Sequence, residues 1–292
     1  DRNTSMAVLR TVIQDTHKKL EKVGIPDARL EAEVLVMSVL RMPRQSLFGE
    51  QETEVTGQQQ STLDELLERR YQREPLAYIL GQREFYGITV VLTPAVLIPR
   101  PETEGLVEHA LFMAMMGMES RDLIIADVGT GSGAIAINLA IHLPGGKIFA
   151  VDVEDAVLDV AAYNIRAHGV GDRVTLAIGD LLDAVPEPVD LVVANLPYIP
   201  TDRIPTLQPE VQQEPVLALD GGSDGLDLIR RLLVQAEDKL KDHGIMLLEM
   251  DPEQIPVVAK LALEYFPKGT TSVEKDLAGM DRILVIQRQE PE

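Results

Sequence analysis

Four consecutive residues combine a side-chain amide, a proline and an aromatic ring: Asn195, Leu196, Pro197 and Tyr198. They follow a short apolar run at 189–194, which is typical of a buried strand whose end faces a ligand crevice. The Asn195 oxygen and a neighbouring main-chain carbonyl could accept both N–H bonds of a planar NH2 group and favour charge developing on its nitrogen. These four residues are therefore predicted to bind a substrate nitrogen and catalyse group transfer to it. The alternative is a proline turn capped by Asn195.

A glycine-rich loop lies between a strand-like run and a helical one, and it consists of Gly129, Thr130, Gly131, Ser132 and Gly133. Glycines at this place let backbone approach a ligand closely. Asp152 follows Gly129 by 23 residues, at the end of the next predicted strand, where a carboxylate can accept hydrogen bonds from both ribose hydroxyls. The loop predicts a nucleoside site. The glycines alone fit both NAD and S-adenosylmethionine, and a tight turn beside a surface acid is the alternative.

Asp180 and Leu181 follow a third predicted strand, at 173–178. An acid beside an apolar residue at this strand end could hold an adenine amino group and flank the ring. These two residues are therefore included in the predicted cofactor site. The alternative is that Asp180 caps a helix.

The composition predicts a soluble, cytoplasmic protein. The 292 residues are 45% hydrophobic and 25% charged, enough for two modest domains. No apolar run approaches the roughly 20 residues that span a bilayer, and the N-terminal residues lack a signal-peptide pattern. The sequence has no cysteine, and its five histidines show no ligand spacing. We expect neither disulfides nor a metal.

The net charge of −20 is unevenly placed. Residues 1–85 carry 12 Lys and Arg against 14 Asp and Glu, whereas the rest carries 15 against 33. A surface this negative repels phosphate backbones. We therefore expect no direct nucleic-acid partner for the C-terminal part.

Helical spacing dominates the first part of the chain. Helices are predicted at 5–23, 28–40 and 63–73, the last opened by a capping-box pattern from Thr62 to Glu65. A strand at 86–92 and a turn at Thr93-Pro94 predict a short hairpin, and helix returns over 102–118. The predicted organisation is a helical domain at 1–82, a hairpin linker at 83–101 and a catalytic domain at 102–292.

Strand and helix patterns alternate from residue 123 onward. Strands are predicted at 123–128, 147–152, 173–178, 189–194, 244–250 and 281–287, and helices at 133–142, 154–168, 225–241 and 253–266. This alternation predicts an α/β fold with a doubly wound, mostly parallel sheet. The strands are apolar without clean alternation, as expected when both faces are buried.

Together the motifs resemble the protein-(glutamine-N5) methyltransferases that modify peptide-chain release factors, a class I S-adenosylmethionine-dependent family. The segment Leu97-Ile98-Pro99-Arg100-Pro101-Glu102-Thr103-Glu104 is the most specific. The other segments follow in the family's order at 73–81, 83–87, 129–133, 152, 195–198, 214–215, 219–222 and 276–282.

The resemblance implies a seven-stranded sheet and a five-helix N-terminal domain that docks the release factor. It implies that the glycine loop, Asp152, Leu181 and Asn195 contact S-adenosylmethionine, whose product is S-adenosylhomocysteine. It also implies that Asn195 to Tyr198, with Phe85 nearby, receive the glutamine of a Gly-Gly-Gln loop. The family usually has proline at the Leu196 position. Leucine keeps the main-chain carbonyl but adds an N–H and frees φ.

Three other functions remain to be compared with this one. An N6-adenine-type nucleic-acid methyltransferase would also hold a planar NH2, but the charge argues against it. An NAD-dependent oxidoreductase would leave Asn195 to Tyr198 unexplained. A non-catalytic module that binds release factors would not need the intact glycine loop. We expect a monomeric enzyme.

Overall fold

The computed structural model describes residues 7–116 and 122–289. The chain divides into two compact units, Asp1–Gly81 and Gln82–Glu292. The residues of the expected hairpin linker belong to the second unit. Each unit is described separately below.

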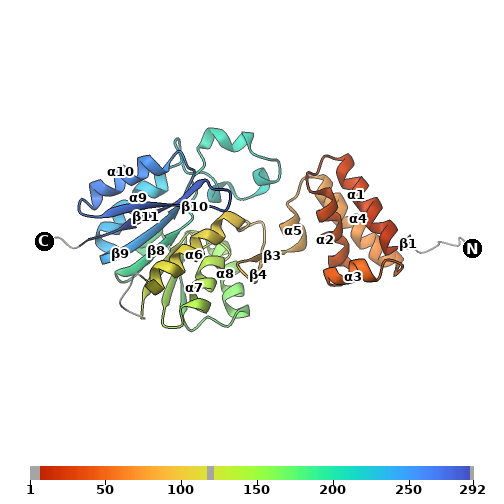
Figure 1. Ribbon diagram of the computed structural model, residues 1–292, viewed down its shortest axis with the longest axis horizontal. Coiled ribbons are helices and arrows are strands. Elements are labelled where there is room, and N and C mark those ends of the chain that lie inside the picture. The colour runs from red at the N-terminus through yellow and green to blue at the C-terminus, as the bar shows by residue number, and fades with distance from the viewer. Residues whose placement is uncertain (1–6, 117–121, 290–292) are drawn as a thin grey trace, which may run out of the picture. The chain divides into compact units, whose positions relative to one another are not determined.

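Over residues 7–81 the first unit contains five helices, drawn from red to orange in Figure 1. They are α1 (Leu9–Lys22), α2 (Ala28–Leu40), α3 (Arg44–Gly49), α4 (Gly57–Tyr71) and α5 (Leu76–Leu80). Two short strands, β1 (Ala7–Val8) and β2 (Glu54–Val55), pair antiparallel. Side chains of all five helices share one hydrophobic core, in which Leu9, Leu35 and Leu67 are buried. The predicted helical N-terminal region is therefore confirmed.

The capping box of α4 lies earlier than predicted. Thr56 has extended backbone, its hydroxyl accepts from the Gln59 N–H at 3.2 Å, and the Gln59 side chain accepts from the Thr56 N–H at 2.9 Å. Thr62 lies inside the helix, where its hydroxyl donates to the Gln58 carbonyl at 3.1 Å. The predicted start at Leu63 was wrong because two similar patterns lie six residues apart, and only the first has Ncap geometry.

The second unit begins with a hairpin of β3 (Gln82–Phe85) and β4 (Ile88–Val91). The chain reverses at Tyr86 and Gly87, with φ of 45° and 78°, as in two-residue hairpin turns. The turn predicted at Thr93-Pro94 is a separate bend after the hairpin. Asn164 accepts from the Val91 N–H at 2.8 Å and donates to the Val91 carbonyl at 3.0 Å, which attaches the hairpin to the rest of this unit.

A seven-stranded sheet in the order β10-β11-β9-β8-β5-β6-β7 forms the centre of this unit. Its strands are β5 (Ile124–Val128), β6 (Lys147–Asp152), β7 (Val174–Ile178), β8 (Val189–Ala194), β9 (Leu240–Glu249), β10 (Thr270–Lys275) and β11 (Asp281–Gln287). β5 to β9 pair in parallel, and only the pairs that include β11 are antiparallel. The predicted mostly parallel, doubly wound sheet is confirmed.

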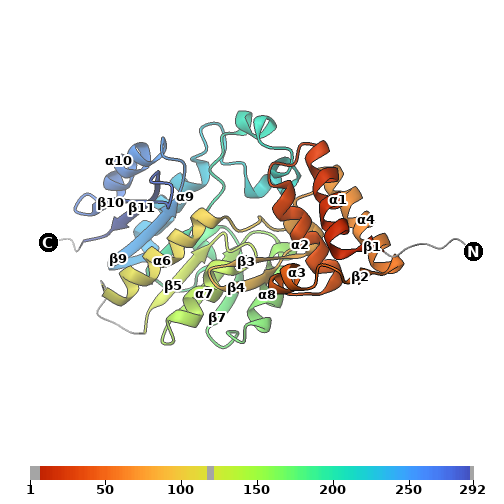
Figure 2. The same cartoon turned by 45° about the vertical axis from the view of Figure 1, so that its right-hand side comes forward.

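Helices cover both faces of the sheet, as Figures 1 and 2 show. They are α6 (Pro101–Met116), α7 (Ala134–His142), α8 (Asp155–Ala167), α9 (Asp227–Lys239) and α10 (Ile255–Tyr265). The first three pack side by side on one face, and α9 and α10 pack together on the other. The predicted end of α6 at Met118 lies outside the described residues.

The prediction missed one strand in this unit and placed the start of another several residues too late. β10 was not predicted from the residues because Thr270–Lys275 is polar and mostly exposed, as an edge strand can be. β9 begins at Leu240, inside the helix predicted over 225–241, and α9 ends at Lys239. Local sequence patterns do not separate a helix end from a strand that follows it directly.

The arrangement of the parallel strands places the site. β5 lies between β6 and β8, so the chain order reverses at the β5–β8 pair. In open α/β sheets ligands bind at such a switch point, beyond the carboxyl ends of the strands. The glycine loop follows β5 and Asn195 follows β8, so both predicted motifs lie at this point.

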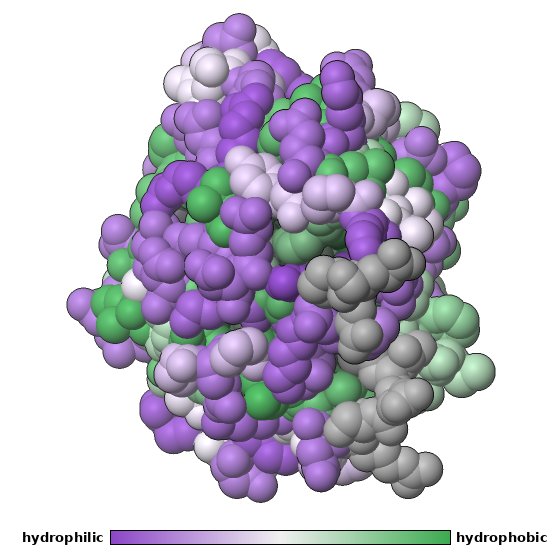
Figure 3. All heavy atoms as spheres, turned by 90° about the vertical axis from the view of Figure 1, so that its left-hand side faces the viewer, coloured by the Kyte–Doolittle hydropathy of each residue, from purple (hydrophilic) through white to green (hydrophobic). Residues whose placement is uncertain are grey.

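The face of the molecule in Figure 3 is mostly hydrophilic, with apolar side chains in small separate patches. Within residues 7–116 and 122–289, no helix is long and apolar enough to cross a bilayer.

Candidate active site at the carboxyl edge of the sheet

The loop after β5 exposes backbone in a conformation that suits glycine. Gly129, Gly131 and Gly133 have φ of +75°, +56° and +83°. The Gly131 N–H donates to Asp152 Oδ2 at 3.1 Å, so the loop and the predicted ribose acid are in direct contact. A Cβ built at Gly131 would meet no atom within 4 Å. At Gly131 the loop therefore turns bare backbone toward open space, which leaves room for a ligand to approach it.

A buried acid anchors this loop from below. The Thr130 hydroxyl donates to Asp127 Oδ2 at 2.6 Å, and the Ala136 N–H donates to the same oxygen at 3.1 Å. Complete burial raises the pKa of Asp127 to about 7, although both hydrogen bonds lower it. Through these two hydrogen bonds Asp127 links the end of β5 to the glycine loop and to the start of α7.

Asp152 lies at the end of β6, beside the loop. Its Oδ2 accepts from Gly131, and its Oδ1 accepts from the Val153 N–H at 2.9 Å. Burial raises the pKa of the carboxyl group. Each carboxylate oxygen has two lone pairs, so both oxygens can still accept a hydroxyl proton. The geometry fits a ribose, and this role remains a prediction.

The residues after β7 are arranged differently from the capping alternative. Asp180 makes no side-chain cap to the 3-10 turn that follows it, and it forms an ion pair with Arg231 of α9. Leu181 is buried and has a left-handed backbone, with φ of 53°. A non-glycine residue in this region costs on the order of 1–3 kcal/mol and is often found at ligand sites.

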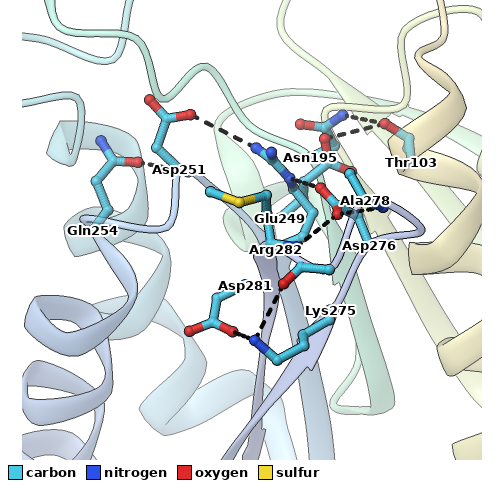
Figure 4. A network of polar contacts seen from close by, with 12 residues as sticks. Thr103, Asn195, Glu249, Asp251, Gln254, Lys275, Asp276, Ala278, Asp281 and Arg282 are labelled. Carbon is cyan, nitrogen blue, oxygen red and sulfur yellow. Dashed lines mark hydrogen bonds and ion pairs between the residues drawn. The ribbon is translucent and has the colours of Figure 1, made fainter.

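The Asn195 side chain is held from one side, as Figure 4 shows. Its Nδ2 donates to the Thr103 hydroxyl at 3.0 Å, and that hydroxyl donates to Glu249 Oε1 at 3.1 Å. Among the described residues no hydrogen bond to Asn195 Oδ1 is present. The amide oxygen is therefore left to accept an N–H, and its contact with a substrate amide stays a prediction.

Leu196 connects the two motifs. Its side chain is only 4% exposed, and its Cδ2 lies 3.1 Å from the position of a Cβ built on Gly129. Any side chain at position 129 would crowd it. Leucine at position 196 thus packs against the glycine loop, a contact that sequence analysis did not predict.

A second glycine loop supports Pro197 and Tyr198 from behind. A Cβ on Gly221 would lie 2.7 Å from the Pro197 carbonyl oxygen, and a Cβ on Gly225 would overlap the Tyr198 carbonyl oxygen. The Gln254 side chain donates to that same carbonyl of Tyr198 at 2.8 Å. This close packing explains why glycine stands at positions 221 and 225.

Sequence reasoning assigned no role to several polar residues around the motif. Thr103 and Glu249 hold Asn195, and Glu214 accepts from Arg100 at 2.5 Å and from the Ile98 N–H at 3.0 Å. The available signal was a carboxylate within an apolar segment, as Glu249 is in 245–250. Such a residue is expected to be hydrogen-bonded where it is buried.

Comparisons with known proteins agree along the chain. The family model described as PrmC N-terminal domain matches residues 11–81, and that described as Ribosomal protein L11 methyltransferase (PrmA) matches residues 109–221. A release factor glutamine methyltransferase of Moorella thermoacetica is 40% identical over 283 residues, which cover 97% of this chain and 99% of the relative. One from Thermosynechococcus vestitus is 43% identical over 77% of this chain and 78% of its own length.

The chain belongs to the release factor glutamine methyltransferase family. The resemblance predicted from the motifs is confirmed. Solved structures agree on the fold alone: the hMettl16 catalytic domain, 16% identical, aligns with a TM-score of 0.57 over 74% of this chain and 81% of its own. Membership of this methyltransferase family argues against the NAD-dependent alternative.

One of the predicted substrate-binding residues, Phe85, lies in the hairpin. Its side chain is 1% exposed at the end of β3. The next residue is also fixed, because the Tyr86 N–H donates to Glu104 Oε1 at 2.9 Å. The ring is covered by protein atoms, so its contact with a glutamine remains a prediction.

Proposed function

We propose that this chain methylates the side-chain amide nitrogen of the glutamine in the Gly-Gly-Gln motif of a peptide-chain release factor. The observation that carries the proposal is the Asn195 amide, which is anchored through its nitrogen and has its oxygen left to accept. An acceptor at the end of β8, beside a nucleoside-type loop, suits a planar NH2 brought to a methyl donor. The names of the relatives supply the release factor as the substrate class.

The residues at the loop fit the methyl donor. Gly129 to Gly133 would lie against the donor, Asp152 would accept from its ribose, and Asp180 and Leu181 would border its base. When bound, S-adenosylmethionine supplies a methyl group on a sulfonium and leaves as the neutral thioether S-adenosylhomocysteine. No metal is needed for this reaction.

The chain's own contribution is orientation. Asn195 Oδ1 and the Leu196 carbonyl oxygen would each accept one N–H of the target amide. This fixes the NH2 plane and favours positive charge on the nitrogen as the N–C bond forms and the C–S bond breaks. One of the two amide protons then passes to water, and the methylated amide is neutral.

The helical unit is proposed to dock the release factor. It is nearly neutral, unlike the second unit, so it could contact a basic or mixed surface. Leu30 and Phe48 are 49% and 62% exposed and line one hollow on this unit. Exposed apolar side chains around a hollow are typical of protein interaction sites.

Mass spectrometry of a release factor incubated with the enzyme and S-adenosylmethionine tests the whole proposal. We expect the mass of one methyl group on the Gly-Gly-Gln glutamine and none on a factor with glutamate at that position. Methylation of adenine in nucleic acid, with an unmodified factor, would overturn the proposal in favour of the amino-methyltransferase alternative.

Replacement of Asp152 with alanine is expected to weaken S-adenosylmethionine binding by about 1–3 kcal/mol, the scale for hydroxyl partners left unmade. Calorimetry measures the loss. Asp180→Ala is the comparison, and it should weaken binding less than Asp152→Ala does, because the Asp180 carboxylate is already paired with Arg231. An Asp152→Ala variant with unchanged affinity would remove Asp152 from the cofactor site.

Replacement of Leu196 with proline is expected to leave methyl transfer within about tenfold of the original, because the carbonyl is kept and the loop stiffens. The buried leucine atoms are lost, so the thermal midpoint should fall. Leu196→Ala loses the same packing but keeps the N–H and the free φ. If proline is far less active than alanine while both stay folded, then the Leu196 N–H or φ is required.

A further inference from the structure

Three side chains from distant parts of the sequence form a single buried chain of hydrogen bonds. Glu249 ends β9, Thr103 lies in the first turn of α6, and Asn195 follows β8. Thr103 and Glu249 are 3% and 2% exposed. Figure 4 shows the three side chains pointing toward one another. This chain lies directly behind the group that is proposed to hold the substrate.

The direction of the chain is set by proton count. A threonine hydroxyl has one proton and two lone pairs. When Glu249 is ionised it can only accept, so Thr103 donates to it and offers Asn195 nothing but a lone pair. Asn195 must then turn its NH2 toward Thr103, and its oxygen faces the opposite way. A neutral Glu249 could donate instead, which would free the Thr103 proton for Asn195 Oδ1.

Glu249 is held close to the point where it changes charge. Burial raises its pKa to about 7, while the Thr103 hydrogen bond and the charges of Arg282 and Arg100 lower it and Glu102 raises it. Arg282 is shared with carboxylates, since it lies 3.2 Å from Asp276 and 3.7 Å from Asp251.

Among the described residues, Arg282 and Arg100 are the positive groups that act on Glu249. Burial raises the pKa of Tyr198, and the charge of Glu249 raises it further. Glu249 Oε2 is buried, and no donor among the described residues reaches it. A carboxylate with one unsatisfied oxygen in such a place costs free energy to ionise.

We propose that Thr103 and Glu249 are positioning residues for methyl transfer, and that an ionised Glu249 orients the Asn195 amide with its oxygen toward the target nitrogen. This inference rests on the proposed function. If the hydrogen bonds run in the opposite direction, Asn195 turns its own N–H groups toward the N–H groups of the substrate. Two sets of N–H donors repel each other. Because Glu249 loses its proton as the pH rises, kcat should rise with pH through about 7.

The experiment measures kcat and KM of the full chain on a release factor at saturating S-adenosylmethionine, between about pH 6 and pH 8.5, on both sides of the expected pKa. Thr103→Val removes the hydroxyl at nearly the same volume. We expect about a 10–100-fold lower kcat, the scale for a lost orienting contact, with cofactor affinity unchanged and no rise through pH 7. Thr103→Ser keeps a hydroxyl at this position, so it should show both the original kcat and the rise of kcat through pH 7.

Glu249→Gln separates charge from shape. Its side-chain oxygen can still accept from Thr103, so kcat should remain measurable but lose the rise near pH 7. Burial also raises the pKa of Asp127 to about 7. If kcat of Glu249→Gln still rises through pH 7, the rise belongs to another group and the proposal is overturned. A Thr103→Val enzyme with the original kcat would also overturn it. If the unmodified chain methylates no release factor at any pH, it is the proposed function that fails.

Discussion

Replacement of Asn195 with alanine is expected to lower kcat for methyl transfer by about 10²–10³-fold, the range measured when one preorganised polar group is removed from a reacting centre. Asn195 lies at a strand end where ligand contacts are expected, not in the core. Its oxygen has no protein donor among the described residues, and its nitrogen donates one hydrogen bond, to Thr103, so we expect the fold to survive the loss of the side chain. Quantitative mass spectrometry of the release factor over time gives the rate.

Two controls make this result specific. The thermal unfolding midpoint of Asn195→Ala should match the original, since Thr103 keeps its bond to Glu249. Affinity for S-adenosylmethionine should be measured as well, because Asn195 is also predicted to touch the cofactor. If the variant binds cofactor and methylates at nearly the original rate, the target amide is held elsewhere and the proposed mechanism must be abandoned.

Removal of the helical unit is expected to separate cofactor binding from recognition of the release factor. A chain that begins at Gln82 retains the whole of the second unit, including both hairpin strands. All predicted cofactor residues lie in this unit, so affinity for S-adenosylmethionine should be unchanged. Activity on the whole factor should fall below detection, because the proposed docking surface around Phe48 is gone.

A short Gly-Gly-Gln peptide is the matched substrate for this test. It is too small to need docking, so the truncated and full chains should methylate it at similar slow rates. Calorimetry of the truncated chain establishes that its cofactor site is intact. Methylation of whole release factor at the full rate by the truncated chain would show that the helical unit has no docking role.

Most of the fold was predictable because its elements have strong local patterns. The buried strands β5, β6 and β8 are apolar runs bounded by turns, and the pattern of such runs alternating with amphipathic helices specifies a parallel sheet. The sequence patterns did not predict β10, because an edge strand can be polar and still pair through its backbone. The position of the α4 capping box was predicted wrongly, because the two candidate threonines differ in backbone conformation and residue types do not reveal that conformation.

The sequence by itself determined the residue types that chemistry needs and their place after particular strands. Glycines at 129, 131 and 133, Asp152 and Asn195 all had to come to the same edge of the sheet, because the carboxyl ends of parallel strands meet there. Family membership followed from the same motifs. None of this requires knowledge of which side chains touch.

The tertiary structure alone decided how Asn195 is oriented. Thr103 and Glu249 lie 92 and 54 positions away from it in the chain, and only the packing of α6 against the ends of β8 and β9 brings the three together. Likewise, only packing shows that Leu196 fills the space beside Gly129. Contacts between residues so far apart have no period in the sequence, because their geometry depends on how separate elements are stacked.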